Sequence, residues 1–557
     1  MSDSLPGYAG PAPGAATAPP PRPADFQPGG AGRRRWLAAA GWVVGGAALF
    51  AFFVRIAMNF PQNSDGASDA LAAWNMLHGT PLLHGWLLAD VTFYTLELPI
   101  LMLSEIFFGL SVLSSYVASA IVYLLVAVCA VALAVRGSAG IARLARGGAA
   151  LAVLAIPLAI PYGLWVEIGP PDHMGTSVFI LLSFLLIDRD RIPRYTAPLV
   201  GVILCAGQLG DLTVRYTAVP AIILVSAYRM AVARRVRTAD GALAAAAILS
   251  VPAEIVVRGV MRHFGAYMMN TPDSALVPAK WPHNVALLWD VVRWLFGANR
   301  APGVPLHGAL TILGLISLFA AAAGLIAVAV RWRTASRPEQ ALALVIVFNL
   351  AAFVLSSIPT ATDSHEIAVV LPAGAILAAR FLVPARITAR LRAGAVATVA
   401  AAAALVPLVA AATFPRAHQH SDTVVAWLEA HHLSYGLAGY WSASATTQSS
   451  GGKVEVRTIA VQGKTAWTYD WEMDTDWYDA TRYYANFVAI EDNQPALTAA
   501  MAERAFGKPA TIGTVRGWEI LVYNHNLLKQ VKASALPPVE LRADPRGPWR
   551  VQLLLSG

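Results

Sequence analysis

The chain has 557 residues, of which 57% are hydrophobic and only 13% are charged, and its mean hydropathy is +0.55. A soluble protein of this length needs far more charge to cover its surface, so the composition excludes a water-soluble enzyme and indicates a membrane protein. The net charge of +8 comes from arginine clusters between apolar runs, which orient a membrane protein, so we expect no nucleic-acid partner.

Residues 1–32 are rich in Pro, Gly and Ala and contain almost no large apolar side chains, which predicts a disordered cytoplasmic tail. Arg33-Arg34-Arg35 follows, and then an apolar run from Trp36 to Val54. This run is too long for a signal peptide, and no small-residue cleavage site follows it. It is predicted to be the first membrane span, with the arginines holding the N-terminus in the cytoplasm.

Ten further apolar runs follow, most of them long enough to cross a bilayer as helices. With the first, they predict an all-α polytopic membrane protein with about eleven transmembrane helices, in a membrane domain that covers residues 33–415. The ten runs cover approximately 111–135, 147–166, 175–187, 196–211, 217–233, 241–257, 308–330, 341–358, 366–383 and 393–414.

Arginine-rich loops alternate with loops that carry no Lys or Arg, such as those near 167–174 and 359–366. Because positive charge resists translocation, the arginine-rich loops are predicted to be cytoplasmic. An odd number of spans then places everything after Phe414 outside the plasma membrane. The arginines assigned to the cytoplasm are Arg136, Arg143, Arg146, Arg189, Arg191, Arg194, Arg229, Arg234, Arg235, Arg237, Arg331, Arg333, Arg337, Arg386, Arg390 and Arg392.

Two outer loops, 55–110 and 258–307, contain helical patterns that are too polar to cross the membrane. In the first loop, Leu71, Trp74 and Leu77 share one helix face. Both patterns predict helices lying in the outer interface. The plainer alternative is that they pack against the rim of the helix bundle. The apolar stripe of the second loop consists of Val285, Leu288, Trp289, Val292, Leu295 and Phe296.

From about Arg416 the composition becomes that of a soluble domain, so we expect a small extracytoplasmic α/β domain over 416–530. Residues 531–557 contain four prolines and predict a flexible tail. The expected helices and strands of the domain are Thr423–His432 and Ala496–Ala505, and Val454–Val461, Phe487–Ile490 and Trp518–Tyr523.

A polar segment directly follows the first span. It begins with Asn63-Ser64-Asp65-Gly66-Ala67-Ser68-Asp69, and Leu77-His78-Gly79-Thr80-Pro81 comes after a short helical stretch. Here the sequence resembles the GT-C superfamily of polytopic glycosyltransferases, which includes protein O-mannosyltransferases and lipid A aminoarabinose transferases. Members of that superfamily have an acidic residue just after the first span, a short helix and a similar turn. They usually have a second acidic residue directly after the first, where this sequence has Gly66.

Later segments extend the resemblance over residues 55–528. Asp363-Ser364-His365-Glu366-Ile367 precedes Val370-Leu371-Pro372, where members often have a basic or aromatic residue near the lipid phosphate of the donor. Two segments are similar to outer domains of actinobacterial members: Tyr440-Trp441 with Ser442 and Thr446, and Tyr523-Asn524-His525-Asn526-Leu527-Leu528.

The resemblance implies sugar transfer from a polyprenyl-phosphate donor. That reaction needs a carboxylate to deprotonate the acceptor hydroxyl, or to hold a metal that assists. Asp65 is predicted to be the catalytic residue, and Asp69, Glu97 and Asp172 are candidate acids of the same cavity. The alternatives are that Asp69 and Asp172 cap helices and that Glu97 is a solvated loop carboxylate.

The leaving phosphate needs cations. Basic residues in an outer loop run against the charge bias of the topology, so Arg258, Arg262 and His365 are predicted to bind the lipid phosphate. For any single arginine, the alternative is a contact with lipid headgroups. Some superfamily members bind a divalent metal ion in the loop that here contains Asp172-His173, which makes that ion the one candidate cofactor.

The stretch from Trp467 to Asp479 alternates aromatic rings and carboxylates. Rings stack on sugar faces, so Trp467, Trp471 and Trp477 are candidate glycan contacts. A calcium loop is disfavoured because its glycine and its distal glutamate are absent. The remaining alternative is that the rings anchor the domain to the membrane surface or to its own core.

Together these features predict an inverting GT-C-type glycosyltransferase that moves a hexose or pentose from a polyprenyl-phosphate donor to a glycan, lipid or protein acceptor. Membrane lipids are further expected partners. The first alternative is a multi-span transporter or lipid flippase with an outer domain, which keeps ionisable or helix-breaking residues near the bilayer midplane. Pro157 and Pro252 lie deep in spans and fit that alternative. The second alternative is a non-catalytic assembly or scaffold protein.

Overall fold

The computed structural model describes residues 30–89, 91–160, 166–169, 173–189, 191–234, 238–265, 267–268, 276–299, 306–356, 364–386, 390–492, 494 and 496–533. The chain forms two compact units, Met1–Ala48 and Leu49–Gly557. Most of the predicted disordered tail lies outside the described residues. Its last positions, 30–32, are helical, because helix α1 begins at Gly30 and ends at Ala57.

Each predicted span contains an apolar helix. Seven described helical segments are long and apolar enough to cross a membrane. They comprise α4 (Val112–Val135), α5 (Ile141–Leu158), α9 (Thr213–Tyr216) with α10 (Ala218–Ala233), α11 (Thr238–His263), α13 (His307–Val330), α14 (Arg337–Leu355) and α16 (Arg390–Ala412). The second half of α1 and the helices α7 (Thr176–Ile187), α8 (Thr196–Gly210) and α15 (Val370–Leu382) are shorter and also apolar. The exact number of spans stays a prediction.

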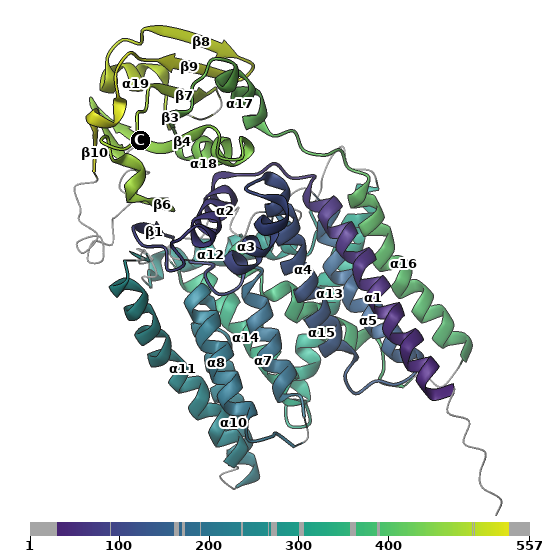
Figure 1. Ribbon diagram of the computed structural model, residues 1–557. Coiled ribbons are helices and arrows are strands. Elements are labelled where there is room, and N and C mark those ends of the chain that lie inside the picture. The colour runs from purple at the N-terminus through teal and green to yellow at the C-terminus, as the bar shows by residue number, and fades with distance from the viewer. Residues whose placement is uncertain are drawn as a thin grey trace, which may run out of the picture. The chain divides into compact units, whose positions relative to one another are not determined.

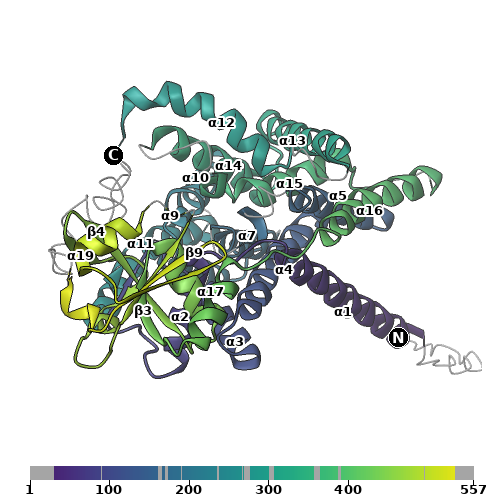
Figure 2. The same ribbon diagram turned by 90° about the horizontal axis from the view of Figure 1, so that it is seen from above.

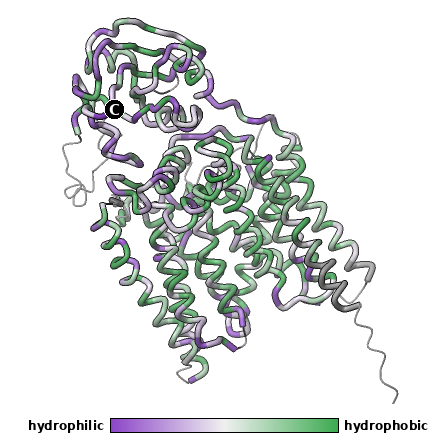
Figure 3. Tube along the Cα trace, in the orientation of Figure 1, coloured by the Kyte–Doolittle hydropathy of each residue, from purple (hydrophilic) through white to green (hydrophobic). Residues whose placement is uncertain are grey.

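Small side chains let the membrane helices approach closely. The pair α5 and α16 is rich in alanine, and a Cβ atom added at Gly148 would lie 3.1 Å from the Cβ of Ala400. Close backbone approach of this kind is how helices pack where lipid is as apolar as the side chains. Most residues along the helices of the bundle are hydrophobic (Figure 3), and α11, for example, exposes Ile255, Val256 and Val260.

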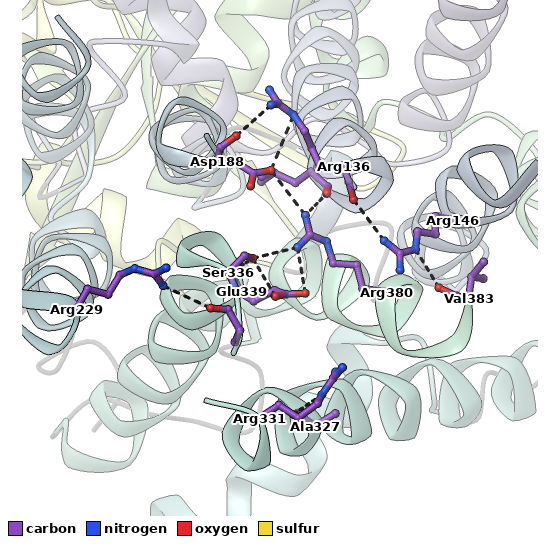
Figure 4. A network of polar contacts seen from close by, with 12 residues as sticks. Arg136, Arg146, Asp188, Arg229, Ala327, Arg331, Ser336, Glu339, Arg380 and Val383 are labelled. Carbon is purple, nitrogen blue, oxygen red and sulfur yellow. Dashed lines mark hydrogen bonds and ion pairs between the residues drawn. The ribbon is translucent and has the colours of Figure 1, made fainter. Parts of the chain in front are cut away.

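The arginine-rich loops meet at one end of the bundle, where ion pairs join them (Figure 4). Arg380 of α15 contacts Glu339 of α14 at 3.1 Å and Asp188 at 3.8 Å, and Arg136 also contacts Asp188, at 3.9 Å. Arg337 contacts Asp240 at 2.9 Å. The C-terminal domain lies at the opposite end (Figure 1). The arginine-rich loops and the C-terminal domain thus lie at opposite ends of one bundle.

The first outer loop forms two helices, α2 (Ser64–Leu77) and α3 (Glu97–Phe108). Contrary to the prediction, α2 does not lie on the interface, because most of its residues are buried against α3 and against helix α18 (Tyr440–Ser449) of the C-terminal domain. The exposed apolar helix of this loop is α3, with Leu103, Ile106, Phe107 and Phe108 on its surface.

The second outer loop contains the turn η1 (Pro278–Lys280) and helix α12 (Trp281–Leu295). Val291 and Leu295 of α12 are buried against the bundle, whereas Val285 and Trp289 are exposed. Part of the predicted stripe therefore packs on the rim and part faces outward. The turn η2 (Ser364–Ile367) packs against α12 and α14.

The C-terminal domain is an α/β domain built on a seven-stranded sheet in the order β10-β5-β4-β3-β7-β9-β8. The central strand β3 (Tyr435–Ala438) runs parallel to both β4 (Glu455–Gln462) and β7 (Phe487–Glu491). All five predicted elements are present, as α17 (His420–Ala430), α19 (Ala499–Phe506), β4, β7 and β9 (Trp518–Val522). The elements that the sequence did not predict are α18, β3, β5 (Thr465–Thr468), β6 (Met473–Asp474), β8 (Thr511–Val515), η3 (Thr475–Tyr478), η4 (Leu527–Gln530) and β10 (Val531–Lys532). The strand β10 occupies the start of the predicted tail, and 534–557 lie outside the described residues.

A second, three-stranded sheet links this domain to both outer loops. Its central strand β1 (Trp86–Leu88) pairs in parallel with β2 (Tyr267–Met268) and antiparallel with β6 (Met473–Asp474). Seen from above, the C-terminal sheet lies over α2 (Figure 2), and α18 fills the space between them. The first loop, the outer end of α11 and the C-terminal domain are therefore held together as one layer.

Candidate active site

The carboxylate of Asp65 lies in the first turn of α2. The helix begins after Asn63, whose side chain accepts a hydrogen bond from the backbone N–H of Gly66, and the Nδ2 of Asn63 donates to Asp65 at 3.2 Å. A carboxylate in a first helical turn is stabilised by the helix dipole. The predicted capping role of Asp69 is wrong, because Asn63 is the cap and Asp69 lies one turn further along, 6% exposed.

Helix α18 docks directly on this turn. The hydroxyl of Ser64 donates to the carbonyl of Tyr440, and the hydroxyl of Ser68 donates to Ser444 at 2.9 Å. These contacts place the phenol of Tyr440, the first residue of α18, against Oδ1 of Asp65. The candidate catalytic carboxylate therefore sits at the junction of the membrane domain and the C-terminal domain.

A second carboxylate faces the same phenol. The hydroxyl of Tyr440 lies 2.8 Å from Oε2 of Glu472, which is 7% exposed. The ring of Tyr469 lies beside that of Tyr440, with 4.9 Å between centroids. Burial, and after it the charge of Asp65, raises the pKa of Tyr440 well above its ordinary value, so the phenol keeps its proton. The sequence showed Glu472 only as one of several acids in an aromatic stretch, because nothing local indicates which acid meets Asp65.

The three candidate tryptophans occupy different places. Trp477 is 7% exposed, with its ring edge-on to Trp86 and the guanidinium of Arg457 4.1 Å above its centroid. It is a core residue, and no sugar can stack on it. Trp471 is partly exposed and packs beside Tyr440 and Tyr469. Trp467 lies on β5, with the ammonium of Lys532 5.8 Å from its ring centroid.

A buried charge cluster lies near the outer end of α11. Glu254 is fully buried and accepts a hydrogen bond from Arg258 at 2.6 Å and another from Arg215 of α9. Two guanidinium groups and one carboxylate leave the cluster with a net positive charge. Met261, on the same helix between Arg258 and Arg262, packs in the cluster of apolar side chains that also contains Leu71 of α2. The predicted phosphate-binding arginines and Asp65 are thus attached to neighbouring elements.

His365 belongs to a second polar cluster. Its Nε2 lies 3.8 Å from Glu366, and its ring stacks on that of His173 with 5.9 Å between centroids. His173 in turn contacts Glu366 at 3.6 Å through Nε2 and Asp211 at 2.8 Å through Nδ1. The cluster therefore joins η2, the start of α7 and the end of α8.

Glu97 begins α3, and its carboxylate occupies the place where Gly175 would carry a side chain. With Glu167 it lines a small cavity to which Ser119 also contributes, and Asp65 is not among the lining residues. Within the described ranges, neither carboxylate oxygen of Glu167 has a hydrogen-bond partner. Glu97 therefore lies closer to the His173 cluster than the sequence indicated.

Asp172, the remaining candidate acid and half of the candidate metal pair, lies outside the described residues, as does Asp363. Among the residues that the structure describes, no group of three or more His, Cys, Asp and Glu side chains is arranged to hold a metal ion.

Two solved structures share the fold of this chain. A crystal structure of ArnT from Cupriavidus metallidurans bound to undecaprenyl phosphate matches with a TM-score of 0.52 at 14% identity, covering 88% of this chain and 99% of ArnT. The apo crystal structure matches with a TM-score of 0.50 at 14% identity, over 87% and 98%. The chain has the ArnT fold. No protein-family model and no curated protein matches the sequence.

ArnT is the lipid A aminoarabinose transferase, a GT-C glycosyltransferase, so the resemblance predicted from the sequence is confirmed at the level of fold. Because the match extends over nearly all of ArnT, it includes both the membrane bundle and the C-terminal domain. The ArnT-like arrangement brings the polar clusters at the Asp65 turn, at Glu254 and at His173 to the end of the bundle that carries the C-terminal domain.

Proposed function

We propose that the protein is a membrane glycosyltransferase that moves a sugar from a polyprenyl-phosphate donor to an acceptor at the outer face of the plasma membrane. The observation that carries the proposal is the position of Asp65. This carboxylate stands at the junction of α2 and the C-terminal domain, in a chain with the fold of a protein crystallised with undecaprenyl phosphate. A carboxylate in that place can take a proton from an acceptor that arrives from the aqueous side.

The orientation follows from the charge distribution. The end of the bundle that carries the arginine-rich loops is the cytoplasmic one, because positive charge resists translocation. Asp65 and the C-terminal domain then lie outside. The donor, whose lipid tail stays in the bilayer, would present its phosphate at the same level.

The cluster around Glu254 supports a site for that phosphate. Arg258 and Arg215 lie on the inner side of α11 and α9, and α11 is still apolar on its outer face at Val260. A lipid phosphate entering between helices at this depth would meet two guanidinium groups that share one carboxylate. Arg262, one turn beyond Arg258, and His365 are further candidate cations, as the sequence predicted.

The proposed reaction is a single displacement with inversion. The acceptor oxygen attacks the anomeric carbon while its proton passes to Asp65, and the bond between that carbon and the phosphate oxygen breaks with its electron pair leaving on the phosphate. The arginines stabilise the negative charge that develops there. Trp471, which packs beside Tyr440, is the proposed stacking surface for a hexose or pentose.

Asp65→Asn tests this function, because the amide keeps the size of the side chain but cannot accept the proton. We expect normal membrane insertion with turnover of a radiolabelled polyprenyl-phosphate sugar in membranes reduced by roughly 10² to 10⁴. The matched control is Asp476→Asn, which removes an exposed carboxylate paired with Arg482. Wild-type turnover in Asp65→Asn would rule Asp65 out as the base, and absence of turnover in the wild-type protein with any polyprenyl-phosphate sugar would contradict the function.

A further inference from the structure

One phenol hydroxyl lies between two carboxylates that come from distant parts of the chain. Tyr440 contacts Oδ1 of Asp65, and its hydroxyl lies 2.8 Å from Oε2 of Glu472. The phenol oxygen is therefore in contact with an oxygen of each carboxylate, and its distance to Glu472 is that of an ordinary hydrogen bond. The phenol carries one hydrogen, so it can donate to only one of the two carboxylates.

The second contact therefore requires a proton of its own. An ionised carboxylate has no hydrogen to donate, and two ionised carboxylates around one oxygen would repel each other in a buried site. The contact is satisfied when one carboxyl group is protonated and donates to a lone pair of the phenol oxygen. The three side chains then form a chain in which one carboxylic acid donates to the phenol and the phenol donates to one carboxylate.

The surroundings decide which carboxyl group holds the proton. Asp65 is only partly buried, lies in the first turn of α2 and receives the Nδ2 of Asn63, and each of these features favours its ionised form. Glu472 is 7% exposed and follows a strand of the domain core, where burial favours the neutral form. The proton is therefore placed on Glu472.

Other titratable groups lie near the two carboxylates. Tyr469 faces both carboxylates as a neutral phenol, and burial raises its pKa above the ordinary value. On α2, Asp69 follows Asp65 by one turn. Beside Glu472 in the sequence, Asp470 accepts from Thr468, and Asp474 accepts from the backbone of Asp476. The cations Arg457 and His84 also act on Asp474, so charges of both signs lie along this stretch.

The backbone of Glu472 is held for this contact. Its φ is +47°, in the left-handed region that residues with a Cβ atom rarely adopt. On one side, the N–H of Trp471 bonds to the carbonyl of Tyr469 at 2.8 Å, and on the other, Met473 pairs with Leu87 in the three-stranded sheet. Unusual backbone conformations of this kind concentrate at functional sites.

We infer that Glu472, as a protonated carboxylic acid, acts through Tyr440 to keep Asp65 ionised and oriented toward the acceptor. This inference rests on the proposed function, in which Asp65 is the base. Glu472 and Tyr440 are positioning residues: the acid donates to the phenol oxygen, the phenol donates to Asp65, and Asp65 alone receives the proton of the acceptor.

Glu472→Gln is the variant that tests the inference, since an amide N–H₂ can replace the acid as donor to the phenol but cannot lose a proton. Wild-type turnover is expected to fall at alkaline pH, where Glu472 ionises. Glu472→Gln is expected to keep turnover within about threefold of wild type at neutral pH and to extend it to higher pH. Glu472→Leu, which has no donor, is expected to lose at least tenfold.

Tyr440→Phe completes the test because it breaks the chain in the middle. It is expected to lose at least tenfold in turnover, and adding Glu472→Gln or Glu472→Leu to it should cause no further loss, since residues that act as a unit are not additive. Loss of turnover in Glu472→Gln equal to that in Glu472→Leu would overturn the inference. It would also be overturned if turnover in Glu472→Gln fell at alkaline pH as it does in the wild type.

An infrared measurement separates this inference from the proposed function. At neutral pH, the infrared spectrum of the purified wild-type protein should contain the carbonyl stretch of a protonated carboxyl group that the spectrum of Glu472→Gln lacks. This band should therefore appear in the difference between the two spectra. Glu455→Gln, which alters a half-exposed carboxylate on β4, should leave it unchanged. A spectrum in which Glu472→Gln removes no protonated carboxyl overturns the inference, whether or not any sugar is transferred.

Discussion

Glu105 is a buried acid on the first outer loop. It lies on α3 at 2% exposure, and within the described part of the chain neither of its carboxylate oxygens has a hydrogen-bond partner. Burial raises its pKa from 4.5 to about 9. The folded protein therefore holds a proton that the unfolded chain has lost over this pH range.

Linkage gives the sign of the effect. From about pH 4.5 to about pH 9, the free energy of unfolding should fall as pH rises, by up to about 1.4 kcal/mol per pH unit from this group. Glu105→Gln, which stays neutral, should flatten the dependence of the melting temperature on pH in detergent. The control is Glu429→Gln at an exposed carboxylate. The same pH slope in Glu105→Gln as in the wild type would show that Glu105 is ionised in the folded protein.

The arginines of the Glu254 cluster give a prediction about donor binding. A charge-assisted hydrogen bond contributes about 1.5–3 kcal/mol, so Arg258→Gln should weaken the binding of undecaprenyl phosphate to the purified protein roughly tenfold or more. Glu254→Gln should strengthen it, because the two guanidinium groups lose their competing carboxylate.

Arg136→Gln is the matched control for that binding measurement, since Arg136 lies in the ion-pair network at the other end of the bundle. Native mass spectrometry can report the bound lipid for all variants. If Arg258→Gln binds the lipid as tightly as the wild type, Arg258 only joins α11 to its neighbours.

At the scale of elements, the network around Arg380 joins three loops. Its guanidinium contacts Glu339 and Asp188 and donates to the carbonyl of Leu133 at 2.6 Å, with 10% of the side chain exposed. Removing one partner of a buried pair leaves the other charge uncompensated. Arg380→Met should therefore lower the free energy of unfolding by on the order of 3 kcal/mol.

Thermal unfolding in detergent, with Arg331→Met as control, checks this expectation. Arg331 is exposed and donates to Ala327 in its own helix, so its loss should change little. Equal melting temperatures for the two variants would show that the Arg380 network contributes no more than a surface contact.

Hydropathy predicted the membrane elements well and the outer helices poorly, for a physical reason. A membrane span must be apolar along about 20 residues whatever it contacts, so its sequence carries the signal by itself. The hydrophobic pattern of α2 is the same whether its apolar face contacts lipid or protein. Only the docking of α18 shows that the helix is covered by protein.

The candidate site was predictable to a similar degree. Asp65 follows a span, and the polar residues around it in the sequence identify it as a candidate. Glu472 and Tyr440 reach it through the long-range pairing of β1 with β6 and the docking of α18 on α2, which local patterns do not encode. The ion pairs of Arg215 and Arg258 with Glu254 also join residues that are distant in the sequence.

For the whole molecule, the prediction is topological. With Cys129 and Cys205 replaced by Ala, a cysteine at the exposed position Lys464 should react with a membrane-impermeant maleimide in intact cells. A cysteine at the exposed position Thr334, in an arginine-rich loop, should react only after permeabilisation. The reverse pattern would place the C-terminal domain in the cytoplasm and contradict the proposed reaction.

The three-stranded sheet also constrains how the protein is made. Strand β1 is synthesised early, but its partner β6 lies nearly 400 residues later, as the pairing of Leu87 with Met473 shows. At about 5–20 residues per second, the first outer loop waits roughly 20 to 80 s for that partner. Until then the strand edge is unpaired and Asp65 lacks both Tyr440 and Glu472. Under the proposed function, a nascent or prematurely terminated chain would lack the assembled site, so sugar transfer would begin only when translation is complete.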